Sequence, residues 1–190
     1  MSFDGRDTVV LFDELAYEDV LSLVWQPRPS DFGEPTALHL AEQNLRLLQA
    51  CDALEEHSTV EKPDETSPYA ADLARMDFKI NLLLDLVGQL LTASQVRPRA
   101  QPVRFNALGA TWQWSAGGAV PVVGSQGLLQ LYLRDSLVQP LTLPGRITIA
   151  AQDGQVRASF EMLGELVADQ LEKLVFRNHR RKIAGARVAR

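Results

Sequence analysis

Residues 67–94 have the sequence SPYAADLARMDFKINLLLDLVGQLLTAS, which predicts one long helix. Thr66 or Ser67 can accept a hydrogen bond from the free backbone donors of the first turn, and Pro68 stands where a missing N–H costs nothing. Apolar residues then recur at alternating spacings of three and four, the heptad period of a helix that packs along a partner helix. The predicted seam consists of Tyr69, Leu73, Met76, Ile80, Leu83, Val87 and Leu90.

The apolar surface of this helix is wider than one seam, because Leu84 and Leu91 add a second column and Leu86 lies on the other flank. An ordinary core helix would have such a stripe, and self-association is the alternative. β-Branched residues at position a with leucine at d favour parallel pairing. One neighbour does not cover the whole stripe, so we expect a homo-oligomer, with a tetramer favoured over a dimer. The apolar run is interrupted and too short to span about 30 Å of hydrocarbon, so no membrane span is expected.

The composition is that of a soluble protein, with 46% hydrophobic and 23% charged residues in 190. The first ten residues show no secretory signal, and we expect a cytoplasmic protein. The single cysteine, Cys51, excludes an internal disulfide and a multi-cysteine metal cage. His39, His57 and His179 are scattered without metal-ligand spacing, so no metal site is predicted. No catalytic constellation stands out, and the chain is not expected to be an enzyme.

The charge is divided unevenly along the chain. Residues 1–66 hold fifteen acidic and four basic residues, a net charge of −11, whereas residues 67–190 carry +6. From Lys173 onward there are seven basic residues and no acid. This basic end can complement the dipole of its own helix, contact the acidic part of a neighbouring subunit, or bind nucleic acid or another anionic surface. Nucleic acid is the least favoured of these hypotheses.

The N-terminal third contains one well-marked helix. Thr8–Leu15 is interpreted as an edge strand or an anchoring segment, and Tyr17–Leu23 as a possible helical turn. Two prolines and a glycine predict a loop over Trp25–Gly33. Glu34–Glu56 has apolar residues at helical spacing and predicts a second amphipathic helix. Its expected partner is the helix of residues 67–94, which a polar connection would allow to lie antiparallel.

The pattern changes after Val96 to short alternating strands and turns, with Asp153-Gly154 as the tight-turn pair of a hairpin. Strands at this spacing suggest a small antiparallel barrel, and helix returns from Gly164. The chain is therefore divided into an acidic N-terminal segment (1–66), an oligomerisation helix (67–96), and a barrel with a basic C-terminal helix (97–190). The expected strands are Val103–Asn106, Ala110–Trp114, Leu129–Leu133, Leu141–Ala150 and Gln155–Met162.

This order of elements resembles the PilZ domain family of bacteria over residues 97–186. The resemblance rests on the strand region LYLRDSLVQPLTLPGRITI (131–149) and the helix LVFRNHRRKIAGAR (174–187). With INLLLDLVGQLL (80–91) in front of the barrel, the chain is similar to non-consensus PilZ proteins that carry added N-terminal helices. The resemblance implies an α+β fold: a six-stranded antiparallel barrel with a C-terminal helix, preceded by long coiled-coil helices. It also implies regulation through cyclic di-GMP of motility, pili, surface polysaccharide or virulence.

Family members that bind the dinucleotide use an Arg-x-x-x-Arg segment just before the barrel and a later Asp/Asn-x-Ser-x-x-Gly turn. Paired guanidiniums offer forked donors to phosphates and stack on guanine. Here Arg97, Arg99 and Arg104 contain no pair with that spacing. At the turn Gly109 matches, but Arg104 and Asn106 replace the acidic or amide residue and the serine. The site that the resemblance implies is therefore degenerate.

Three hypotheses follow. The first is an oligomeric, non-enzymatic adaptor without a cofactor, which contacts other copies of itself and an unidentified regulatory protein. The second is a cyclic di-GMP receptor that uses Arg97, Arg99, Arg104, Asn106 and Gly109 in an altered geometry. The third is a nucleic-acid contact through the basic C-terminal helix.

Overall fold

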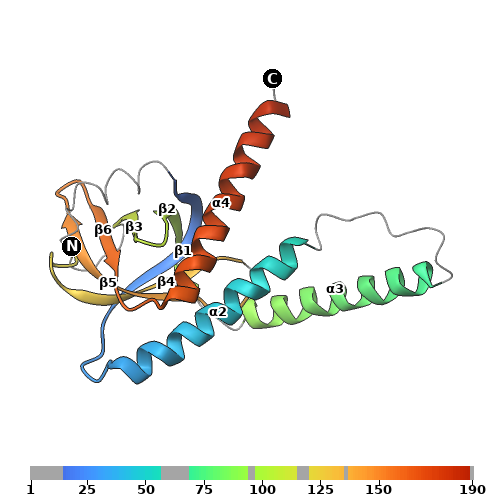
Figure 1. The fold of residues 1–190 in the computed structure, drawn as a ribbon, viewed down its shortest axis with the longest axis horizontal. Coiled ribbons are helices and arrows are strands. Elements are labelled where there is room, and N and C mark those ends of the chain that lie inside the picture. Colours follow the sequence, from blue (N-terminus) through green and yellow to red (C-terminus); the bar gives the residue numbers. More distant parts are fainter. Residues whose placement is uncertain (1–14, 57–68, 94–96, 115–119, 135–136, 189–190) are drawn as a thin grey trace.

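The computed structural model describes residues 15–56, 69–93, 97–114, 120–134 and 137–188 (Figure 1). Within these ranges six antiparallel strands form a closed barrel, and helices lie beside it. The predicted α+β class, with a six-stranded antiparallel barrel and a C-terminal helix, is confirmed. The elements are β1 (Tyr17–Pro27), α2 (Glu34–Glu56), α3 (Ala70–Ala93), β2 (Ala100–Phe105), β3 (Gly109–Gln113), β4 (Gln126–Tyr132), β5 (Leu141–Ala150), β6 (Gln155–Phe160) and α4 (Glu165–Val188).

The barrel is closed by a strand that the sequence analysis missed. The strands follow the order β1-β2-β3-β6-β5-β4, so β1 pairs with both β2 and β4. The helical turn predicted at Tyr17–Leu23 is wrong. Leu21 and Leu23 alternate with outward-facing residues and bury their side chains in the barrel. The barrel is thus not confined to residues 97–190, because α2 and α3 are inserted between its first two strands.

The barrel core is built from inward-facing apolar side chains of every strand. Phe105, Trp112, Leu129, Leu143 and Val156 are all fully buried. The predicted Asp-Gly hairpin between β5 and β6 is present, with Gly154 at φ 85°. The list of buried barrel residues also includes Val103, Ala110, Leu131, Leu141, Ile147 and Ala158.

Helix α2 spans the predicted residues, but it packs against α4 and β5 rather than against α3. The buried residues on α2 include Leu47, Leu48 and Cys51, which face the barrel and α4 instead of a helical hairpin. Asn44 of α2 is buried and bonds both backbone groups of Thr142, donating to its carbonyl (2.7 Å) and accepting from its N–H (3.0 Å). The expected α2–α3 pair is therefore wrong, because covering the barrel uses the apolar face of α2.

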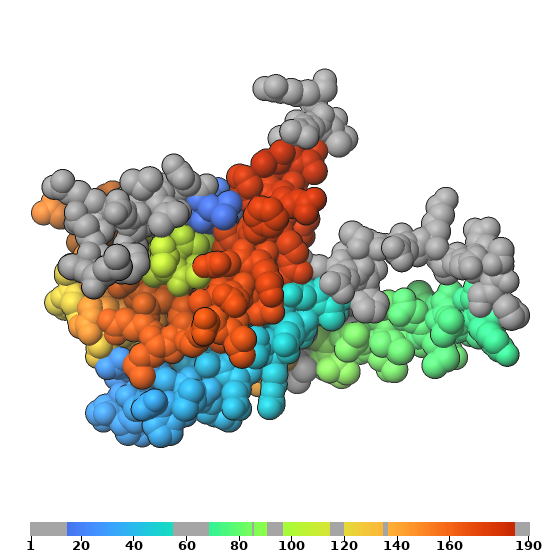
Figure 2. Space-filling model, viewed as in Figure 1, coloured from blue at the N-terminus to red at the C-terminus, as the bar shows by residue number. Residues whose placement is uncertain are grey.

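Helix α3 extends away from the barrel (Figures 1 and 2). Its described large apolar side chains are 47–73% exposed, so the interpretation of α3 as an ordinary core helix is wrong. The predicted cap at Thr66, Ser67 and Pro68 lies outside the described residues, as does the segment Thr8–Glu14 and the side chain of Leu91. No helix in the described ranges combines the length and apolarity that crossing a membrane requires.

Candidate functional site

Helix α3 carries more exposed large apolar side chains than any other described element. We use the name α3 seam for the six residues at heptad positions a and d of this helix. The flanking side chains of Leu84 and Leu86 are also about half exposed, at 49% and 47%. A contiguous apolar stripe of this kind is typical of an interface rather than of free surface. The α3 seam consists of Leu73, Met76, Ile80, Leu83, Val87 and Leu90, all exposed.

Arg97 holds the connection between α3 and β2 against the barrel. Its guanidinium donates to the carbonyls of Arg134 (3.5 Å) and Leu137 (3.0 Å) and lies over the ring of Tyr132, 5.4 Å from the centroid. Tyr132 ends β4, so the contact joins two parts of the barrel rim. The guanidinium that was expected to bind a phosphate is thus engaged by backbone carbonyls and an aromatic ring.

The other two expected arginines lie apart from each other on the barrel. Arg99 is exposed just before β2, whereas Arg104 lies near the other end of β2, about 17 Å along a strand that rises roughly 3.3 Å per residue. The Arg104 Nε lies 3.0 Å from a carboxylate oxygen of Glu18 on β1, and Lys182 of α4 approaches the same carboxylate at 3.2 Å. The structure therefore does not bring Arg97, Arg99 and Arg104 together.

Asn106 and Gly109 shape the turn between β2 and β3. The Asn106 Oδ1 accepts the N–H groups of Leu108 (2.8 Å) and Gly109 (3.2 Å), and its Nδ2 donates to the carbonyl of Leu15 (3.4 Å). A Cβ at Gly109 would collide with the carbonyl oxygen of Ala158 on the paired strand β6. Both residues thus have structural roles that need no ligand.

The position of β1 changes where the arginine motif has to be sought. Because the barrel begins at Tyr17, the segment just before it is residues 1–16 rather than 97–104. Residues 1–16 contain one arginine, Arg6, and no Arg-x-x-x-Arg.

An open pocket of about 560 Å³ lies between the β2–β3 turn and α4. Its polar rim carries Asp169, Glu172 and Lys173, which gives it more negative than positive charge. Such a rim opposes an anionic nucleotide. Among the described residues, no group of three metal-ligating side chains gathers here or elsewhere. The apolar lining comes from Leu15, Ala107, Leu108, Val175 and Phe176.

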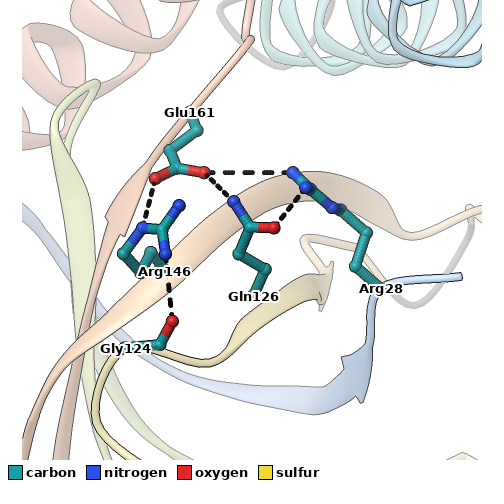
Figure 3. A network of polar contacts seen from close by, with 5 residues as sticks. All are labelled: Arg28, Gly124, Gln126, Arg146 and Glu161. Atoms are coloured by element: carbon teal, nitrogen blue, oxygen red, sulfur yellow. Dashed lines mark hydrogen bonds and ion pairs between the residues drawn. The ribbon is translucent and has the colours of Figure 1, made fainter. Parts of the chain in front are cut away.

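A second polar cluster, absent from the sequence analysis, lies on the barrel surface (Figure 3). Arg146 of β5 donates through Nε to Glu161 (2.7 Å), which follows β6, and Gln126 of β4 donates to the same carboxylate (3.1 Å). Arg28, which follows β1, donates to the Gln126 amide oxygen and lies 3.9 Å from Glu161. No spacing motif could have revealed this cluster, because barrel closure brings its members together. We call Arg28, Gln126, Arg146 and Glu161 the arginine cluster.

Comparison with known proteins identifies the family of the chain. Residues 45–188 match the family model of the atypical PilZ domain, described as a cyclic di-GMP receptor. The chain belongs to the atypical PilZ domain family. The predicted resemblance to PilZ domains is thus confirmed, and the matched region of this PilZ protein includes α3. The comparison with curated proteins gave no match.

Among solved structures, this PilZ chain is similar to a pathogenic protein from Xanthomonas campestris. The two are 28% identical, with a TM-score of 0.69, over 90% of this chain and 91% of the other. The crystal structure of the Xanthomonas protein is described as a new tetrameric PilZ domain that self-assembles via an unusual helical bundle. The inserted helices are thus included in a likeness that spans nearly the whole of both chains.

Proposed function

We propose that this atypical PilZ protein is a homotetrameric, non-enzymatic signalling adaptor that assembles through parallel α3 helices. The observation that carries the proposal is the α3 seam, which is exposed along the length of the helix. Burial of such a seam in a bundle removes apolar surface from water, the main driving force of association. The tetrameric, helix-bundled Xanthomonas neighbour supports the same arrangement.

The second part of the proposal is that cyclic di-GMP does not bind through the usual motif. Arg97 bonds carbonyls, Arg104 pairs with Glu18, and Asn106 bonds its own turn. Signalling then depends on contacts with a regulatory protein in the cytoplasm. The processes that the family resemblance suggests are motility, pili, surface polysaccharide and virulence, and the pathogenic description of the Xanthomonas protein favours virulence.

Titration calorimetry with cyclic di-GMP tests the adaptor proposal. We expect no binding heat that depends on Arg97 and Arg99 in the full-length protein. Micromolar binding that is abolished in the variant Arg97→Ala with Arg99→Ala would overturn the proposal. Arg99→Ala alone is the matched control, because Arg99 is exposed while Arg97 bonds the barrel rim. A thermal melt of each variant separates lost binding from lost folding.

A receptor with an altered site is the second candidate, and the description of the family as cyclic di-GMP receptors favours it. Its residues would be Arg97, Arg99, Arg104, Asn106 and Gly109, moved from their present contacts. The calorimetric titration decides between the two candidates, because heat that requires these arginines supports the receptor alone.

The basic end of α4 favours a third candidate, contact with nucleic acid. Arg180, Arg181 and Lys182 are exposed on α4, although Lys182 also lies 3.2 Å from the Glu18 carboxylate of β1. Arg177, by contrast, pairs with Asp52 of α2. Phosphate contacts make affinity fall steeply as salt rises. The absence of any gel shift at low salt would exclude this candidate.

A further inference from the structure

Two arginines from distant parts of the chain converge on one carboxylate in the arginine cluster (Figure 3). Glu161 accepts from Arg146 on one oxygen and from Gln126 on the other, with Arg28 facing the second oxygen. The side chains are reachable from solvent, since Arg28 is 20%, Glu161 28% and Arg146 43% exposed. The cluster is therefore a surface site that holds two positive charges and one negative charge.

The single carboxylate does not use all the donors directed at it. The 3.9 Å between the Arg28 Nη1 and Glu161 exceeds the 2.7–3.2 Å of a hydrogen bond. Arg146 donates through Nε to Glu161 and through Nη1 to the carbonyl of Gly124 (3.0 Å), and its Nη2 has no hydrogen-bond partner among the described residues. The cluster thus has spare donor capacity as well as spare positive charge.

We propose that Arg28 and Arg146 form a binding site for a phosphate group, which Glu161 occupies when no ligand is bound. A phosphate presents more oxygens than a carboxylate, and the planar forks of two guanidiniums match them. Gln126 contributes a further amide donor. Arg28 is already oriented, because it lies over the ring of Phe32 at 5.6 Å, so less freedom is lost on binding.

The position of Glu161 connects this site to the helices. Its N–H donates to the carbonyl of Pro144 (2.9 Å), and the next residue, Met162, has φ 56°, in the left-handed region that non-glycine residues rarely adopt. Glu161 thus lies at the start of the connection from β6 to α4, and Arg28 at the start of the connection from β1 to α2. A phosphate that displaces the Glu161 carboxylate replaces its side-chain bonds to Arg146 and Gln126 at the first connection and contacts Arg28 at the second. The site therefore lies where the chain leaves the barrel toward both α4 and α2.

The test measures phosphate binding by calorimetry at low ionic strength on the full-length protein and its Glu161→Gln variant. Removing the competing carboxylate charge should tighten binding by about tenfold, the effect of one modest charge interaction. Arg146→Gln added to Glu161→Gln should abolish the gain. Glu165→Gln is the matched control, because it removes the same charge from an exposed position in the first turn of α4. It should leave the affinity unchanged.

Inorganic phosphate, GMP and cyclic di-GMP are titrated separately, so that a monoester site and a diester site can be told apart. Equal affinity of the Glu161→Gln and Glu165→Gln variants for all three probes would overturn the proposal and leave the cluster a structural latch. If the Glu161→Gln variant does not fold, the affinity of an Arg146→Lys variant for the same probes tests the proposal instead. This variant keeps the charge but removes the fork, and unchanged affinity there would also refute the site. Neither result depends on whether α3 forms a tetramer.

Discussion

Replacing Ile80 and Leu83 by aspartate in the same chain should break the assembly while the barrel stays folded. The two residues are adjacent a and d positions in the middle of the α3 seam. No extensive packing joins α3 to another described element of the same chain, and α3 extends away from the barrel (Figure 1). The substitution therefore removes apolar contacts between chains rather than within one.

The magnitude follows from the surface that each side chain still exposes. Ile80 is 51% and Leu83 61% exposed in the single chain. Complete burial of such a side chain contributes about 1.5–3 kcal/mol, so burying the exposed half contributes about 0.8–1.8 kcal/mol for each residue. The pair therefore contributes about 1.6–3.4 kcal/mol per chain, which corresponds to a factor of about ten to several hundred in the association constant. Two carboxylates without partners in an apolar seam add a further penalty.

Size-exclusion chromatography with light scattering at micromolar concentration is the assay. The unmutated protein should have a mass of about 84 kDa, four times the chain mass of 21.0 kDa, and the double variant should approach the mass of one chain. Asn81→Asp with Gln89→Glu is the control, because it adds two negative charges outside the seam. Tryptophan fluorescence, to which the buried Trp112 contributes, reports the integrity of the barrel. A monomeric mass for the unmutated protein would refute the reasoning.

Two further predictions concern the contacts that hold the barrel and its helices. Asn44→Ala leaves the N–H and carbonyl of Thr142 without their buried partner. Chemical denaturation should therefore show that the free energy of unfolding falls by about 2–4 kcal/mol. A decrease below about 0.5 kcal/mol would contradict the importance of these two hydrogen bonds. Gly109→Ala places a Cβ against the carbonyl oxygen of Ala158 and should lower the unfolding free energy by about 1–3 kcal/mol. Gly33→Ala, whose Cβ would meet only an ordinary contact at 3.7 Å, is its control and should be nearly neutral.

The parts of the fold that could be predicted are those with a strong local period. α2 and β5 begin and end where their apolar patterns do, and α3 falls within the predicted range. β1 was missed because Tyr17, Val20 and Leu21 also fit a helical spacing over so short a stretch. The segment forms a strand because it pairs with β2, more than 70 residues later in the chain. A local sequence pattern contains no information about that pairing.

The candidate sites differ in the same way. The α3 seam lies within one continuous helix, so its heptad period is visible in the sequence alone. Arg28 and Glu161 are brought together only by barrel closure, and neither belongs to a motif. The expected nucleotide-binding residues follow the inserted helices, whereas the barrel itself begins at Tyr17. Local periodicity thus reveals the proposed assembly surface, whereas the arginine cluster requires the tertiary structure.

The insertion of α2 and α3 between β1 and β2 determines how an assembly would present its barrels. The chain leaves the barrel along β1 and returns to it at β2, and these strands are paired neighbours, with Ser22 opposite Ala100. Arg97 fastens the returning segment to the rim through the carbonyl of Leu137 and the ring of Tyr132. Each barrel is therefore attached near the C-terminal end of its α3. A parallel bundle of α3 helices would consequently gather the barrels around one end.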